Sequence, residues 1–303
     1  MIQRIPLEDT SPASPGPGAE AWRRLRRHPV ALACGLYILL LVLVALFAPA
    51  LAPYPYDAMD TRGVLPAPPD AHHLLGRDNL GQDVFSRLLY GARVSLSVAA
   101  GVVAIEVVIG VTLGLIAGYY GGTTDLILMR LTDVMFAFPD ILLAILLRAI
   151  VMSGSKAVSL GTNLATLFLA LGLVGWPGIA RLVRGQALAL RQKEFIEAAR
   201  AIGVRDRHIL WRHMLPNLLS PIIVQVTQDV AGVILAEATL SFLGIGVPPP
   251  FPSWGRMINE ARDFMRSQPL LLLSPSLALA LTVMAFNFFG DALRDALDPR
   301  LRQ

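Results

Sequence analysis

Long apolar runs with few charged side chains alternate with shorter polar segments along the chain. A helix needs about 20 residues to cross roughly 30 Å of hydrocarbon. Six windows are long enough, and none shows the two-residue alternation of membrane-barrel strands, so the pattern predicts an all-α membrane protein with six transmembrane helices. The predicted spans lie near residues 30–47, 93–125, 129–150, 164–180, 222–243 and 270–289.

Charged residues distinguish these windows from one another. The second window is interrupted only by Glu106, and the fifth contains Asp229 and Glu237. The third window has the weakest apolar signal, so its prediction also depends on the chain having an even number of spans. Its charged residues are Arg130, Asp133, Asp140 and Arg148.

The composition also indicates a membrane protein. Hydrophobic residues make up 54% of the 303 residues and charged residues only 16%, whereas soluble domains contain about 25% charged residues. The mean hydropathy is +0.58. The formal net charge of +4 is too small to indicate nucleic acid as the main partner, and the single cysteine, Cys34, excludes an internal disulfide.

The distribution of basic residues predicts the orientation, because lysine and arginine near span ends favour the cytoplasmic side. The two tails and residues 181–212 hold 16 of them, and the other three connections hold eight. Both termini are therefore expected to be cytoplasmic. The first apolar run could instead be a cleaved signal, but it exceeds the roughly 7 to 15 residues of such a region, so a retained span is the preferred interpretation.

The predicted organisation has four parts. Residues 1–28, rich in proline, serine and glycine, are expected to form a disordered cytoplasmic tail. Residues 29–92 hold the first span and an extracytoplasmic loop, in which residues 84–89 could form a short amphipathic helix. Residues 93–293 form a five-helix core, and residues 294–303 form a second cytoplasmic tail.

Glycines and prolines indicate further local structure. Gly110, Gly114 and Gly118 recur every four residues and predict a helix face that another helix can approach closely. The segment 244–255 contains four prolines, which remove backbone donors, so it is expected to form a non-helical cap on the outer side.

The inner segment at residues 191–217 carries the most specific pattern. It predicts two short helices with Gly203 at the bend, since glycine readily adopts the left-handed conformation that ends a helix, and with Pro216 where the next helix begins. Glu197, Ala198 and Ala199 are expected to face a cytoplasmic partner. An amphipathic loop lying on lipid is the alternative. The expected apolar contacts to the partner come from Phe195, Ile202, Ile209 and Leu210.

The spacing of this segment resembles the coupling loop of ATP-binding-cassette (ABC) importer permeases. Glu197-Ala-Ala is followed by three residues, Gly203, nine residues, and then His213-Met-Leu-Pro216. Other segments resemble the second permease subunit of the dipeptide/oligopeptide (peptide/nickel) branch of these importers. They lie at residues 75–87, 118–122, 135–139, 240–246, 254–255 and 291–299.

This resemblance implies a type I ABC importer permease fold in the cell (inner) membrane. It implies a homologous second permease subunit, two ATPase subunits that bind ATP and Mg²⁺, and an extracytoplasmic substrate-binding protein. The chain itself is expected to hold no cofactor. The residues that match the coupling motif, and that would dock on an ATPase subunit, are Glu197, Ala198, Ala199, Gly203, Leu215 and Pro216.

Di- or oligopeptides are the expected solutes, with glutathione or a nickel complex as alternatives. The chain departs from the family pattern at Glu106 and Asp229, which are acidic where apolar or small residues are expected. The connection at residues 153–163 is also unusually long.

Polar and small residues form one stripe along the fifth predicted span. They are Gln225, Gln228, Asp229, Gly232 and Ala236, spaced three or four residues apart. An ionised aspartate at the bilayer centre costs about 2.5–3.5 kcal/mol, so the stripe is not expected to face lipid. It either lines the translocation path or packs against the partner permease or Glu106. Both hypotheses remain open at this point.

Catalysis within this chain is not predicted. The two lysines, Lys156 and Lys193, are followed by Ala157 and Glu194, so no phosphate-binding P-loop is present. The five histidines do not form a zinc motif. A secondary transporter is one alternative, although no duplicated segment is visible. An intramembrane enzyme is the other, with Asp133, Asp140, Asp229 and Glu237 as possible acid/base groups.

Overall fold

The computed structural model describes residues 22–153 and 160–297, and these residues are largely helical and contain no β-strand element, only isolated bridges. The longer helices are α2 (Pro29–Leu51), α3 (Val84–Tyr120), α4 (Gly122–Phe136), α5 (Asp140–Ser153), α6 (Leu160–Arg191), α9 (Leu215–Phe242) and α11 (Pro269–Leu297). The shorter ones are α7 (Glu194–Ala201), α8 (Asp206–His208), a π-helix at Ile209–Met214, α10 (Trp254–Ala261) and a 3₁₀ turn at Arg262–Phe264.

Five helices in the described part of the chain are long and apolar enough to cross a membrane. They are Pro29–Leu51, Val84–Tyr120, Leu164–Arg191, Asp206–Phe242 and Pro269–Leu297. They correspond to five of the six predicted spans.

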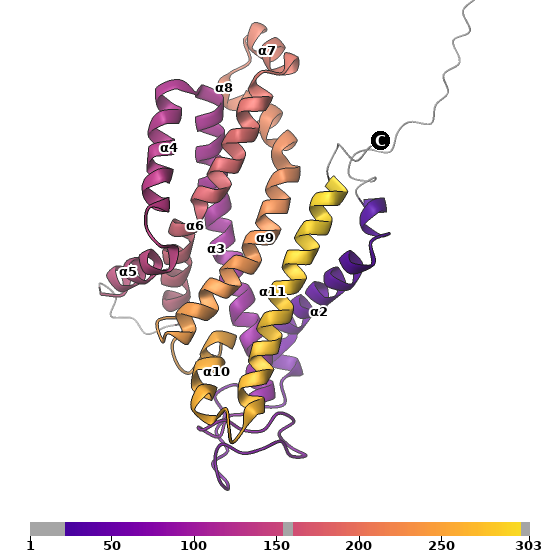
Figure 1. Cartoon of the computed structure of the whole chain (residues 1–303), viewed down its shortest axis with the longest axis vertical. Coiled ribbons are helices and arrows are strands. Elements are labelled where there is room, and N and C mark those ends of the chain that lie inside the picture. Colours follow the sequence, from indigo (N-terminus) through magenta and orange to yellow (C-terminus); the bar gives the residue numbers. More distant parts are fainter. Residues whose placement is uncertain (1–21, 154–159, 298–303) are drawn as a thin grey trace, which may run out of the picture.

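The prediction of one continuous helix at residues 129–150 is wrong. The chain forms α4 and α5, which are separated by residues 137–139, and α5 turns sharply away from α4 (Figure 1). Pro139 explains the break, because proline has no N–H to donate and disfavours helical geometry at the preceding residue, Phe138. A hydropathy window does not register this local effect.

Close packing between α3 and α6 confirms the predicted glycine face. A Cβ atom at Gly110 would lie 2.7 Å from the Cβ of Ile179, and one at Gly118 would lie 2.6 Å from the Cβ of Ala187. At Gly114 it would overlap a carbonyl oxygen of α6. Only glycine lets the two helix backbones come this close, so these three positions fix how α3 and α6 pack.

The remaining spans complete a single bundle. Helix α9 packs against α3 and α11, and α2 packs against α3 and α11 on the other side. The start of α2 and the end of α11 lie toward the end of the bundle that carries α7, whereas α10 and the loop at residues 52–83 lie at the opposite end (Figure 1). The cytoplasmic location of both termini stays a prediction.

The loop at residues 52–83 is tied to the start of α3. The Asp83 carboxylate accepts hydrogen bonds from the Ser86 backbone N–H at 2.7 Å, which caps the helix, and contacts His73 Nδ1 at 2.9 Å. Residues 84–89 are helical, as expected, but they are the first turns of α3 and not a short helix of their own, and Val84, Ser86 and Arg87 are buried. The Arg87 guanidinium lies among Asp78, Gln82 and Glu260 and joins the loop to α10.

The segment that follows α9 forms the expected non-helical cap up to Ser253, where α10 begins. Trp254 is buried beneath it, and its indole N–H donates to the Leu88 carbonyl oxygen at 3.2 Å. Glu237 is also buried and accepts hydrogen bonds from Ser95 at 2.9 Å and Ser241 at 2.6 Å. These contacts hold the cap against α3 and α9.

Several predicted boundaries need correction or lie outside the described residues. The boundary between residues 92 and 93 falls inside α3, and the one between residues 293 and 294 falls inside α11. Residues 22–25 are helical, and residues 1–21 of the expected disordered tail lie outside the described part. The same is true of residues 154–159 in the long connection and of residues 298–303.

Candidate functional site

Residues 191–217 form a helical knuckle at one end of the bundle (Figure 1). Helix α7 ends at Ala201, and Gly203 follows with a φ angle of +77°. The Val204 N–H donates to the Ala199 carbonyl oxygen at 3.0 Å, and the Gly203 N–H donates to Arg200 at 2.9 Å. These two bonds define a Schellman motif, which requires a left-handed residue at Gly203. The predicted bend at Gly203 is therefore present.

The exposed face of α7 differs from the prediction. Glu197 and Ala198 are exposed, as expected, but Ala199 is only 7% exposed. Ala199 lies three residues after the fully buried Ile196, so both side chains share the inner face of the helix. The site that a partner can reach on α7 therefore centres on Glu197 and Ala198.

The expected apolar contacts also divide into two groups. Phe195 and Ile202 are exposed, and Ile202 is 80% exposed although it is a large apolar side chain. Ile209 and Leu210 are instead buried in the cluster that joins the knuckle to α3 and α6. Only the first pair is available to a partner, while the second pair anchors the knuckle.

Pro216 lies at the start of α9 (Leu215–Phe242), as expected. No break precedes it, because α8, the π-helix and α9 follow one another without a gap from Asp206 to Phe242. The π-helix at Ile209–Met214 directly precedes the proline, and the Leu215 N–H bonds to the Leu210 carbonyl five residues back. This wider turn gives the proline ring room within the helix. Leu215 packs against the buried cluster, whereas Pro216 is exposed. Both residues belong to α9 and not to α7.

A tyrosine that the sequence analysis did not identify joins both halves of the knuckle. The Tyr119 hydroxyl, at the end of α3, donates to Asp206 Oδ1 at 2.6 Å and accepts from Arg200 Nε at 3.3 Å. The Arg200 guanidinium also lies 4.6 Å from the centre of the Tyr119 ring. Arg200 belongs to α7 and Asp206 to α8. Neither the glycine spacing nor the family resemblance of residues 118–122 indicates this role for the tyrosine.

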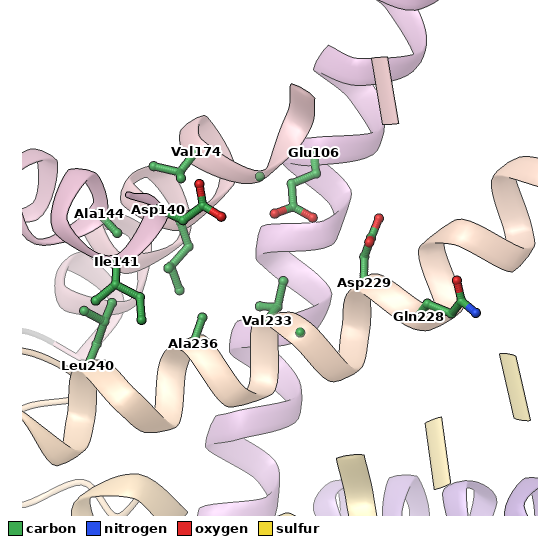
Figure 2. Close-up of a pocket in the computed structure, with 13 residues that line it drawn as sticks. Glu106, Asp140, Ile141, Ala144, Val174, Gln228, Asp229, Val233, Ala236 and Leu240 are labelled. Carbon is green, nitrogen blue, oxygen red and sulfur yellow. The ribbon is translucent and has the colours of Figure 1, made fainter. Parts of the chain in front are cut away.

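A second candidate site is a cavity of about 310 Å³ that is lined by α3, α5, α6 and α9 (Figure 2). Three carboxylates, from Glu106, Asp140 and Asp229, turn toward the same space. The rest of the wall is mostly apolar and includes Ile141, Ala144, Val174, Val233, Ala236 and Leu240. No lysine, arginine or histidine is among the described residues that line it.

Most of the predicted stripe on α9 lines this cavity. Gln228, Asp229, Gly232 and Ala236 all contribute to its wall. Gln225 does not line this cavity, but its side-chain amide donates to Asp229 Oδ1 at 2.8 Å. The stripe and Glu106 thus line the same cavity, and the choice between the two hypotheses stays a prediction.

Glu106 is the most enclosed of the three acids. It is 4% exposed and forms no hydrogen bond or ion pair with any described residue. Gly175 of α6 makes room for it, since a Cβ atom at Gly175 would overlap the Glu106 carboxylate. A buried, ionised carboxylate without a partner is costly, so a glutamate at this place points to a function.

Asp140 reaches the cavity because of the break after α4. The break places Asp140 in the first turn of α5, where the helix N-terminus stabilises negative charge. The sequence analysis placed Asp140 within a continuous span and named it only as a possible acid/base group of the enzyme alternative, and it did not consider Gly175. The Met135–Pro139 segment was the available signal for the first, and no local signal marks the second.

Comparisons with known proteins decide the family. Residues 110–303 match the family described as "Binding-protein-dependent transport system inner membrane component". The chain belongs to this family. Residues 16–69 of this permease also match the "N-terminal TM domain of oligopeptide transport permease C".

Relatives of this permease carry a specific name. It is 46% identical over 303 residues to the glutathione transport system permease protein GsiD of Pectobacterium atrosepticum, covering 100% of this chain and 97% of the relative. It is also 46% identical over 286 residues to GsiD of Escherichia coli, covering 94% and 91% of the two chains.

The fold of this permease also has a counterpart among solved structures. An inward-facing structure of the MetNI methionine ABC transporter matches with a TM-score of 0.56 and 20% identity, covering 71% of this chain and 97% of that chain. This likeness confirms the type I ABC importer permease fold.

Family and fold together establish the general function. The chain is a multi-pass inner-membrane permease subunit of an ATP-driven importer, and ATP hydrolysis takes place on separate ATPase subunits. The alternatives of an intramembrane enzyme and a secondary transporter are therefore set aside.

Proposed function

We propose that this permease imports short peptides, a class that includes glutathione, as one half of a translocation unit formed with a second, homologous permease. The observation that carries this proposal is the 46% identity to glutathione permeases along the whole chain. An extracytoplasmic binding protein delivers the solute, and two ATPase subunits bind ATP and Mg²⁺. The permease itself supplies the path and no cofactor.

In this proposal the knuckle transmits the motion of an ATPase subunit to the bundle. The exposed Phe195, Glu197, Ala198 and Ile202 offer one acidic and two large apolar contacts on a small surface. The buried cluster beneath them ties α7 to α3 and α6. A rigid-body displacement of α7 is therefore passed directly to the two helices that share the glycine face.

The cavity provides the part of the path that this subunit contributes. It lies between α3, α6 and α9, so movement of α3 and α6 against α9 changes its shape. Gln228, Asp229 and Gly232 line it, and Gln225 supports Asp229 from behind.

Reconstitution of the complete importer tests this proposal. The permease is co-purified with its second permease, ATPase subunits and binding protein, placed in proteoliposomes, and supplied with ATP. Uptake of radiolabelled alanyl-alanine, glutathione and a nickel–histidine complex is then compared. ATP-dependent uptake of the peptide or glutathione is the expected result, and uptake of the nickel complex alone would refute the proposal.

A further inference from the structure

We propose that the acidic cavity binds the free primary ammonium group of the imported solute between Glu106 and Asp229. The identity of that solute as a short peptide rests on the proposed function, but the cation preference of the cavity does not. Peptides with a free amino terminus and glutathione both carry a primary α-ammonium group, so the cavity would recognise a group that the two kinds of solute share.

Glu106 is the observation that points to a ligand. The residue is only 4% exposed, its side chain reaches into the cavity, and it has no hydrogen-bond or ion-pair partner among the described residues. Gly175 leaves the space that the carboxylate occupies. The surrounding helices therefore accommodate this acid without neutralising it, and a positively charged ligand would provide the missing partner.

Asp229 is the second carboxylate of the proposed ammonium site, and a neighbouring side chain holds it in place. Gln225 donates to its Oδ1 atom, which fixes the side chain and leaves the second oxygen available. The neighbouring Gln228 is held instead by Asp291 of α11, to which it donates at 3.0 Å. The Glu106 and Asp229 side chains both line the cavity and turn toward the same space (Figure 2). An ammonium group has three N–H donors, enough for a hydrogen bond to each carboxylate.

The remaining features of the cavity favour an organic ammonium group over a metal ion. No group of three His, Cys, Asp or Glu side chains in the described residues is arranged to hold a metal ion. The walls around the carboxylates are aliphatic, from Ile141, Val174 and Val233. They suit the carbon atoms next to an amine better than the hydration shell of an inorganic ion.

The first test measures charge preference without any assumption about the solute. In the assembled complex, Cys34 is replaced by serine and Ala236, which lines the cavity, by cysteine. The rate of modification by aminoethyl methanethiosulfonate, a primary ammonium, is divided by the rate for the anionic sulfonatoethyl reagent. Glu106→Gln and Asp229→Asn should each lower this ratio about tenfold, whereas Glu106→Asp should largely restore it.

Asp133→Asn is the charge-matched control. Asp133 lies on α4, does not line the cavity, and forms an ion pair with Arg181 at a distance of 2.8 Å. It should leave the ratio unchanged. Equal ratios of the two modification rates in wild type, Glu106→Gln and Asp229→Asn would overturn the inference. This is also the result expected if a basic side chain of the second permease already neutralises the two carboxylates.

The second test uses uptake of alanyl-alanine and N-acetyl-alanyl-alanine by the same proteoliposomes. Glu106→Gln should lower uptake of alanyl-alanine, which has a free amine, about tenfold. It should also remove the permease's share of the difference in uptake between alanyl-alanine and the acetylated peptide. If the importer carries neither peptide nor glutathione, the proposed function fails, and the modification ratio still decides the cavity. If peptide uptake is normal in Glu106→Gln, the inference fails and the proposed function stands.

Discussion

Replacing Tyr119 with phenylalanine removes one oxygen atom from the centre of the knuckle. The change deletes the hydrogen bond to Asp206 at 2.6 Å and the longer one from Arg200 at 3.3 Å. The ring is 4% exposed and remains in place, so its packing and its contact with the Arg200 guanidinium persist. The variant therefore tests the hydroxyl alone.

The magnitude follows from the nature of the stronger bond. A hydrogen bond to a charged group contributes about 1.5–3 kcal/mol, and Asp206 can recover part of this from water because it is exposed. A loss of about 1.5 kcal/mol is therefore expected, which corresponds to a local opening of the knuckle roughly tenfold more frequent.

Hydrogen exchange of the assembled importer in nanodiscs measures this opening directly. Amides in α7 and at residues 206–214 should exchange about tenfold faster in Tyr119→Phe, and fewer solute molecules should be imported per ATP hydrolysed. Tyr120→Phe is the matched control, because the Tyr120 hydroxyl has no hydrogen-bond partner among the described residues and its side chain is exposed. Identical exchange in the two variants would refute the role assigned to Tyr119.

Three further predictions concern other parts of the molecule. Glu197→Lys should abolish uptake coupled to ATP hydrolysis while insertion stays normal, and Glu194→Lys on the same helix should have a much smaller effect; equal losses would contradict a specific contact at Glu197. Gly114→Ala should destabilise the purified complex by about 1–3 kcal/mol in thermal unfolding because the new methyl group overlaps the α6 backbone, whereas Gly185→Ala on α6, which meets nothing within 4 Å, should be neutral or stabilising. The Asp70 carboxylate accepts two backbone N–H bonds at 2.7 Å, which lower its pKa, so its stabilisation of the outer loop is complete above the ordinary value of 3.8 and is lost as pH falls through the lower folded-state pKa. Pepsin cleavage of residues 52–83 should rise in that acid range, and an Asp70→Ala variant with the wild-type pH profile would contradict this account.

The apolar pattern predicts most of this fold because every helix that crosses the bilayer needs about 20 predominantly apolar residues. It fails at residues 129–150, where one proline decides the geometry and hydropathy averages over it. The pattern also gives no sign of the π-helix before Pro216, whose residues Ile209 and Leu210 are buried in the cluster beneath α7. Both features are local backbone geometry that a hydropathy average does not register.

The candidate sites were predictable to different degrees. The spacing around Gly203 is local, so sequence alone located the bend of the knuckle. The partnership of Tyr119 with Arg200 and Asp206 links positions more than 80 residues apart, and no periodic pattern marks it. Glu106 and Asp229 were each conspicuous as acids in apolar spans, but only the fold places Gly175 beside the first of them.

That neighbour has a consequence for how the permease can change over time. A Cβ atom at position 175 would overlap the Glu106 carboxylate where it now lies, so a larger residue at 175 forces the glutamate into another rotamer or requires a shorter residue at 106. Either change withdraws the carboxylate from its present place in the cavity. The residues at positions 106 and 175 are therefore expected to vary together among homologous permeases.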